Sequence, residues 1–318
     1  MRSSFGSNID HMSLAVGVKV SEFRIFSHSL FAVFFCHSLF AVFFLASFWR
    51  PYKTFTPIHH HKTMPTHSPQ RISQLKAAGI HLGLSVLLAA LAAVLVFVVW
   101  YPYPYRDISG GRDLFLLLVA VDVIMGPLLT LTVFNPQKPL VKLRTDLALI
   151  AILQLAALGY GLWTVAVARP AHLVFEINRF TVVHAIDVPS ELLIQAPTEL
   201  RQMPWSGPTL LSVRPFKNNA EQTDATMTAM SGLPVGAQPK LWQSYEKGKL
   251  EVLANAKPVA DLKVRFPARV QDIDNALKSL ASSLAVGYVP LVGRDTFWTV
   301  FIDMKTAEVL AFVPIDSF

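Results

Sequence analysis

Three long apolar stretches, residues 80–101, 114–134 and 147–168, set the class of fold that this chain can adopt. Each is as long as the roughly 20 residues that a helix needs to cross about 30 Å of hydrocarbon. Asp122 is the only charged residue within them. We therefore predict an integral membrane protein with three transmembrane helices, forming a transmembrane domain at 80–168 behind a short cytoplasmic lead-in at 64–79.

The positions of the basic residues predict the orientation of the three helices. Cytoplasmic loops of membrane proteins carry an excess of lysine and arginine. In this chain such residues precede the first stretch and separate the second from the third: Lys62, Arg71, Lys76, Lys138, Lys142 and Arg144. The loop between the first two stretches balances two arginines with two aspartates. The N-terminus is therefore expected inside the cell, and the C-terminal domain, 169–318, outside the membrane.

The net charge of +7 raises the question of nucleic-acid binding. Residues 1–170 hold 14 Lys and Arg against 6 Asp and Glu, whereas residues 171–318 hold 14 against 15. The whole excess therefore lies beside the apolar stretches, where membrane topology accounts for it. A lipid bilayer is the expected partner, and nucleic acid is not.

The first 63 residues stand apart from this plan. Within them, 27–49 form a fourth apolar stretch in which residues 28–35 recur almost at once as 37–44. A signal anchor is one interpretation. We favour the other, that 1–63 come from an over-long gene start and that translation begins at Met64. Cys36, the only cysteine, lies here, so the C-terminal domain is expected to have no disulfide.

The C-terminal domain is predicted to be α+β with an antiparallel sheet. Two pairs of strand-like segments indicate hairpins, at 172–177 with 180–186 and at 296–302 with 307–313. Two helices are expected, at 222–230 and 270–284. The proline-rich segment 189–215 is interpreted mostly as loop, and 240–253 is ambiguous between helix and strand.

Asp122 is the first candidate for a functional residue. A carboxylate in the bilayer costs at least a few kcal/mol, and such residues tend to face a bundle interior or a partner. Tyr160, on the third helix, falls at about the same depth, and its hydroxyl could donate to the carboxylate. Three roles are open for Asp122: a pin between helices two and three, contact with a partner helix, or proton transfer and catalysis.

Glycine and proline mark two further candidate surfaces. Gly79 and Gly83 form a small-xxx-small pattern, which lets helix backbones approach closely in lipid. The pattern suits packing inside the three-helix unit, which we favour, or docking of another helix. Pro127, after Gly126, removes a helical hydrogen bond and predicts a kink in the second helix.

The chain lacks the motifs of common enzyme sites. It has no glycine-rich phosphate loop, no Gly-x-Ser-x-Gly elbow and no His-Glu-x-x-His helix. His59, His60 and His61 are adjacent, but no acidic or thiol ligand accompanies them. We therefore predict no catalytic residues, no metal and no cofactor. Three tryptophans are interpreted as core aromatics in preference to binding-surface residues: Trp205, Trp242 and Trp298.

Several segments from Met64 onward, about 255 residues, carry a resemblance to a known family. The most specific is 121–136, with the sequence VDVIMGPLLTLTVFNP. Shorter matches surround it: Ala77-Ala-Gly-Ile-His81, Trp100-Tyr-Pro102, Arg144-Thr-Asp146, Ala168-Arg-Pro170, Val174-Phe-Glu176, Arg179-Phe180, and the terminal hairpin around Trp298, Asp303 and Val313-Pro314. On these residues the chain resembles the type IV pilin accessory proteins, the TfpX/TfpZ group related to FimB.

The resemblance implies a multi-pass protein of the bacterial inner membrane that is associated with a major type IV pilin. It implies a role in the stability of that pilin or in pilus assembly, with the C-terminal domain in the periplasm, and no catalytic activity. The partner surface suggested by the residues comprises Gly79, Gly83, Asp122, Gly126, Pro127 and Tyr160, and the pilus assembly machinery is a further partner. Two alternatives remain open: a membrane-bound pilin-modifying enzyme, which would need a cluster of polar groups outside, and a sensor, which would need a cytoplasmic output module.

Overall fold

The computed structural model describes residues 69–278, 280, 284–294 and 296–318. The interpretations of residues 1–63, including the apolar repeat, Cys36 and the three adjacent histidines, concern a part of the chain outside these ranges. The same holds for Met64 as a start site.

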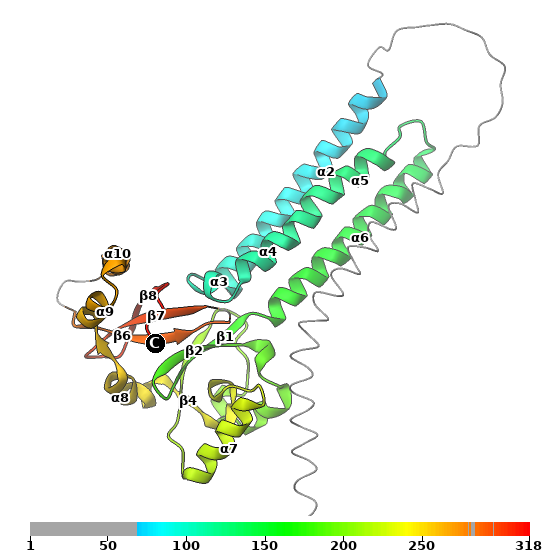
Figure 1. The fold of residues 1–318 in the computed structure, drawn as a ribbon. Helices are drawn as coiled ribbons and strands as arrows, with labels where there is room; N and C mark the ends of the chain where they lie inside the picture. The colour runs from blue at the N-terminus through cyan, green and yellow to red at the C-terminus, as the bar shows by residue number, and fades with distance from the viewer. Residues whose placement is uncertain (1–68, 279, 281–283, 295) are drawn as a thin grey trace, which may run out of the picture. The chain divides into compact units, whose positions relative to one another are not determined.

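Three helices in the described part are long and apolar enough to cross a membrane, as predicted (Figure 1). The first, Arg71–Trp100, combines α2 (Pro69–Val94) with a π-helical end, η1 (Leu95–Trp100). The second, Gly111–Val133, comprises α4 (Gly111–Ala120), a π-helical turn η2 (Val121–Met125) and α5 (Gly126–Val133). The third is α6 (Leu140–Val167). The first and third begin well before the predicted spans, because the helices continue into their polar, basic flanks.

The described residues divide into two compact units. The span unit contains residues 69–92 and 116–164. The sheet unit contains 93–115 together with 165–318. The loop between the first two helices, with the short helix α3 (Tyr105–Ile108), therefore belongs to the same unit as the α+β region.

An eight-stranded sheet forms the centre of the sheet unit, with the order β4-β3-β1-β2-β6-β7-β8 and β5 paired to β6. The strands are β1 (Pro170–Glu176), β2 (Arg179–His184), β3 (Thr209–Val213), β4 (Trp242–Ser244), β5 (Lys257–Pro258), β6 (Val286–Val292), β7 (Phe297–Asp303) and β8 (Val309–Val313). Both predicted hairpins, β1–β2 and β7–β8, are present. The α+β class is thus confirmed. The sheet is mixed, however, because β1–β3 and β2–β6 pair in parallel.

The helices of the sheet unit partly follow the sequence pattern. Asn218 caps α7 (Asn219–Met230), because its side-chain oxygen accepts a hydrogen bond from the Glu221 amide at 2.9 Å. The helix α10 (Val270–Leu277) ends seven residues before the predicted boundary. The segment 240–253, which the sequence left ambiguous between helix and strand, contains both: strand β4 is followed by helix α8 (Tyr245–Asn255). A further helix, α9 (Val259–Arg265), precedes α10.

Strand β7 supplies the centre of the core. Val300, Phe301 and Ile302 are fully buried, and their alternating side chains serve clusters on both faces of the sheet. Trp242 and Trp298 lie in the core, as predicted. Trp205 does not: 65% of its surface is exposed, so the core interpretation is wrong at this position.

Glu176, at the end of β1, is the most deeply buried carboxylate of the described residues, with 1% of its surface exposed. Its Oε2 accepts a hydrogen bond from the Gly236 amide at 2.5 Å. Its Oε1 accepts from the Thr181 hydroxyl at 2.7 Å and from Arg179 Nε at 3.1 Å. The carboxylate thereby joins β1, β2 and the 3-10 turn η6 (Val235–Ala237).

His172 is a second buried polar residue of β1. Its Nδ1 lies 2.6 Å from the Thr209 hydroxyl, its ring meets Trp242 edge to face at 4.8 Å, and its Nε2 has no hydrogen-bond partner among the described residues. Burial lowers the pKa of His172 from 6.5 to about 4 because the charged ring would lose its hydration. The imidazole is therefore neutral in the folded protein at pH 7.

This burial predicts a stability that depends on pH. Between pH 6.5 and about 4 the unfolded state binds more protons at His172 than the folded state. The free energy of unfolding therefore has its full value above pH 6.5 and falls as the pH is lowered. The loss should approach about 3 kcal/mol near pH 4. We expect His172→Gln to reduce the drop in melting temperature between pH 7 and pH 5, measured by circular dichroism on the full chain in detergent. An unchanged drop would contradict this assignment.

Most of the aromatic residues at the end of the first helix are buried. They include Trp100, Tyr101 and Tyr105, and the Tyr101 hydroxyl donates to the Val165 carbonyl at 3.1 Å. Tyr103, between them in the sequence, is exposed, with 62% of its surface accessible. The other three belong to the interior of the sheet unit, because the loop that carries them folds with that unit.

Candidate functional site in the span unit

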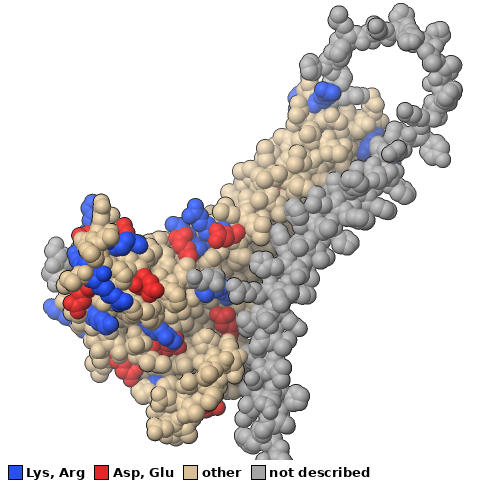
Figure 2. Space-filling model, in the orientation of Figure 1, with Lys and Arg blue, Asp and Glu red and all other residues tan. Residues whose placement is uncertain are grey.

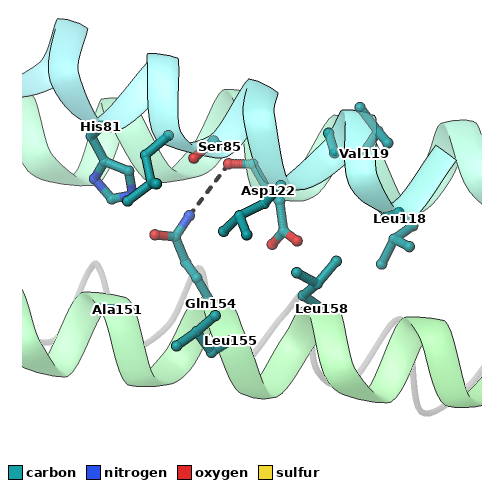
Figure 3. Close-up of a pocket in the computed structure, with 13 residues that line it drawn as sticks. His81, Ser85, Leu118, Val119, Asp122, Ala151, Gln154, Leu155 and Leu158 are labelled. Carbon is teal, nitrogen blue, oxygen red and sulfur yellow. Dashed lines mark hydrogen bonds between the residues drawn. The ribbon is translucent and has the colours of Figure 1, made fainter. Parts of the chain in front are cut away.

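A pocket of about 110 Å³ lies among the three helices of the span unit. Its lining is mostly leucine and alanine, with four polar side chains (Figure 3): His81, Ser85, Asp122 and Gln154. Ser85 is buried, with 7% of its surface exposed. Polar groups are costly in hydrocarbon, so their convergence on one pocket makes it the candidate functional site.

Asp122 sits on the π-helical turn η2, immediately before Gly126 and Pro127. Proline has no amide hydrogen to donate to the preceding turn, and such turns are often accommodated by π-helical geometry. The interruption predicted at this point is therefore a local widening of the helix. Figure 3 shows the Asp122 carboxylate pointing from η2 toward α6. No described residue donates a hydrogen bond to its oxygens.

Gln154, on α6, lies across the pocket from this turn. Its Nε2 donates to the backbone carbonyl of Asp122 at 3.3 Å (Figure 3). Gly126 is buried against it, and a Cβ at Gly126 would overlap the Gln154 amide. The absence of a side chain at Gly126 thus permits close contact between the second and third helices. Gly126 is an internal packing residue, and Pro127 beside it is partly buried.

Side chains of the first helix form hydrogen bonds with the second helix and with the residue that follows it. His81 Nδ1 lies 2.5 Å from the hydroxyl of Thr130, which is itself buried. Nearer the polar end, Gln74 Nε2 donates to the Phe134 carbonyl at 2.9 Å. These contacts hold His81 at the edge of the pocket, opposite the third helix.

The other predicted site residues lie away from the pocket. Gly79 and Gly83 are on an exposed face, and no described residue would come within 4 Å of a Cβ at either position. Packing of these two glycines against the other described helices is therefore not seen, and their contact with a partner stays a prediction. Tyr160 is not part of the pocket lining, and its ring lies 5.8 Å from that of Trp163. Its hydrogen bond to Asp122 stays a prediction.

Three pocket residues were not predicted from the sequence: His81, Ser85 and Gln154. Within the apolar stretches only the charged Asp122 stands out, whereas these three carry polar side chains without a full charge. A count of every polar side chain in the apolar stretches would have found them, because each carries a desolvation cost in lipid.

The chemistry available at this site is that of hydrogen bonding. Asp146, the other carboxylate of the span unit, forms an ion pair with Lys138 at 2.8 Å near the start of α6. Within the ranges that the structure describes, no three His, Cys, Asp or Glu side chains gather in a way that could hold a metal ion. The Asp122 carboxylate can accept a hydrogen bond from a group that enters the pocket, or form an ion pair with a positively charged one.

Three candidate spans and an α+β unit define a membrane protein with several transmembrane helices. The family model described as fimbrial assembly protein FimB matches residues 69–110, which comprise the first span and the loop after it. No solved structure matches this chain.

Relatives from Dichelobacter nodosus extend the match. The fimbrial assembly protein of serogroup I is 39% identical over 246 residues, which are 76% of this chain and 95% of the relative. The protein of serogroup E1 is 37% identical over the same shares. The protein of serogroups C1 and C2 is 44% identical over 121 residues, 38% of this chain and 92% of the relative. The chain belongs to the FimB family of fimbrial assembly proteins.

Proposed function

We propose that this protein is a non-enzymatic accessory factor for type IV pilus assembly that binds the major pilin in the bacterial inner membrane. The names of its relatives, fimbrial assembly proteins, support the role in assembly. The distribution of Lys and Arg supports a cytoplasmic N-terminus and a periplasmic sheet unit.

The observation that carries the proposal is the Asp122 carboxylate in its pocket. A carboxylate within a span is stabilised when another group donates a hydrogen bond to it, and no described residue does so. A helix of the pilin that brings a polar donor into the pocket would supply this bond. The exposed surface at Gly79 and Gly83 offers a second place where helix backbones can approach closely.

A pilin stored in the membrane would offer two parts for binding, a hydrophobic helix and a head outside the membrane. We propose that the span unit binds the helix and the sheet unit binds the head. When two contacts are made by one linked scaffold, the second forms at a high effective concentration, so each can be weak by itself. Such binding suits a factor that must release the pilin to the growing pilus.

A gene deletion with complementation tests this function. We expect the deletion to abolish surface pili while the mass of the remaining pilin stays unchanged. Asp122→Leu should bind pilin at least about tenfold more weakly and restore fewer pili than the wild type, since the lost hydrogen bond to a charged group amounts to about 1.5–3 kcal/mol. Asp122→Asn, which still accepts one hydrogen bond, should restore them better.

Membrane levels of each variant, measured by immunoblot, separate a functional loss from a folding loss. Normal piliation in the deletion strain would contradict the proposal. An altered pilin mass would instead favour the pilin-modifying enzyme. Signalling effects with normal pili would favour the sensor.

A further inference from the structure

The loop 204–207 of the sheet unit is attached to the end of the first span. The Gly207 amide donates to the carbonyl of Val99 at 2.7 Å. Val99 belongs to the last turn of the apolar helix Arg71–Trp100, next to the exposed Val98. Gly207 has a φ of +52°, a backbone conformation that residues with a side chain rarely adopt, and this accounts for the glycine at this position. A loop bonded to this turn must lie at the depth where the span leaves the hydrocarbon.

Arg169 attaches the same loop to the end of the third span. Its NH1 donates to the Ala166 carbonyl at 2.6 Å, within the last turn of α6. Its Nε and NH2 donate to the Pro204 carbonyl at 3.2 and 3.0 Å. Two of the three spans thus end on one short loop, and both attachments are made within the sheet unit.

Trp205, in the middle of this loop, is exposed although its surroundings are apolar and aromatic. Its ring meets that of Trp100 edge to face at 5.9 Å, and the Arg169 guanidinium lies 5.1 Å from its centroid. The outer surface of the indole remains uncovered, with 65% of Trp205 accessible. The two other tryptophans of the 165–318 segment, Trp242 and Trp298, have at most 9% exposed.

We propose that the loop 204–207 is a membrane-surface anchor and that phospholipid covers the exposed face of Trp205. The hydrogen bond from Gly207 to Val99 fixes the depth of the loop at the boundary between hydrocarbon and headgroups. Tryptophan prefers this layer because its ring is mostly apolar while its N–H is polar. The anchor holds part of the α+β unit in the headgroup layer through residues that lie outside the three spans.

The chemistry of the anchor is aromatic. Arg169 uses its guanidinium for internal hydrogen bonds, so little of it is free for a lipid phosphate. Tyr103, exposed just after the first span, adds a second aromatic ring, with Arg106 5.4 Å from its centroid. Arg106 is itself 3.6 Å from Asp107. Anionic lipid should therefore add little to the contact.

A fluorescent label at position 205 tests this anchor in the full chain. In a Cys36→Ser background, Trp205→Cys is labelled with a nitrobenzoxadiazole dye and reconstituted in phosphatidylcholine vesicles. Met230→Cys, at an exposed position on α7, provides the control. Lipid with a spin label near the headgroup should quench the label at 205 at least several-fold more than the label at 230. Iodide in the buffer should show the reverse order.

Equal iodide quenching at the two positions would overturn the proposal. So would shielding of position 205 from both quenchers, which would mean that protein covers it, or a requirement for phosphatidylglycerol. Ser206→Cys, which keeps the Trp205 contacts, gives the same test if the first variant misfolds, as judged by circular dichroism. The experiment contains no pilin, so its outcome is independent of the proposed function.

Discussion

Replacing Glu176 with alanine should lower the free energy of unfolding of the sheet unit by about 3–5 kcal/mol. The carboxylate is 1% exposed and accepts three hydrogen bonds. Its removal leaves the Gly236 amide and the Thr181 hydroxyl buried without an acceptor, and it separates β1 from the turn η6. Chemical denaturation of the full chain in detergent, followed by tryptophan fluorescence, measures the change.

Two variants make this test specific. Glu176→Gln keeps the shape but turns an amide N–H₂ toward one of the donors, so we expect an intermediate loss. Glu246→Ala removes a carboxylate that is 74% exposed and paired with Lys249 on the surface of α8. That variant should change stability by less than about 0.5 kcal/mol. Similar losses for Glu176→Ala and Glu246→Ala would show that the buried network does not stabilise the fold as described.

Leucine at position 126 should have the largest effect in the span unit. A side chain there would overlap Gln154, so Gly126→Leu must separate α5 from α6 or displace the Gln154 amide from Asp122. Overpacking of this kind costs about 1–3 kcal/mol. Because the displaced residues line the pocket, we also expect the variant to bind pilin poorly.

Gly79→Leu is the matched control for this variant. The described residues leave position 79 open, and replacing an exposed helical glycine removes its entropic cost of about 1 kcal/mol. The control should therefore be neutral or slightly stabilising in unfolding by sodium dodecyl sulfate in mixed micelles. Leucine substitutions at Gly161 and Gly159 form a second pair of this kind on α6. A Cβ at Gly161 would overlap Leu118, whereas no described residue lies near a Cβ at Gly159. Equal losses of unfolding free energy within both pairs would contradict these contacts between helices.

Hydrophobic length and strand alternation predicted the large features of the fold. Spans of about 21 residues and the segments around Phe180 and Trp298 carry strong local signals, so the three helices and both hairpins could be recognised. Strands β3 and β6 were missed. The first lies in a proline-rich segment and the second contains Pro290, and proline argues against a strand even where tertiary pairing permits one. The parallel pairings that make the sheet mixed involve these two strands.

The candidate site was predicted in part. Asp122 stands out because charge is rare in a span, and Gly126 follows it four residues later in the sequence. Gln154 lies 32 positions from Asp122, and only the packing of two helices brings them together. The environment of each glycine likewise depends on how the helices pack. Sequence spacing alone does not distinguish the open Gly79 from the buried Gly126, because this depends on which face of each helix meets a neighbour.

Photo-crosslinking in cells that make the cognate pilin tests the central claim, that this protein binds pilin within the membrane. A photoreactive residue is placed at position 83, or at position 119, which lines the pocket beside Asp122 and leaves its carboxylate in place, or, as a control, at position 152, which is exposed on α6. We predict a crosslinked product with the combined mass of this protein and one pilin at positions 83 and 119, and little or none at 152. No pilin adduct at 83 and 119, with the protein present at its normal level, would contradict this claim.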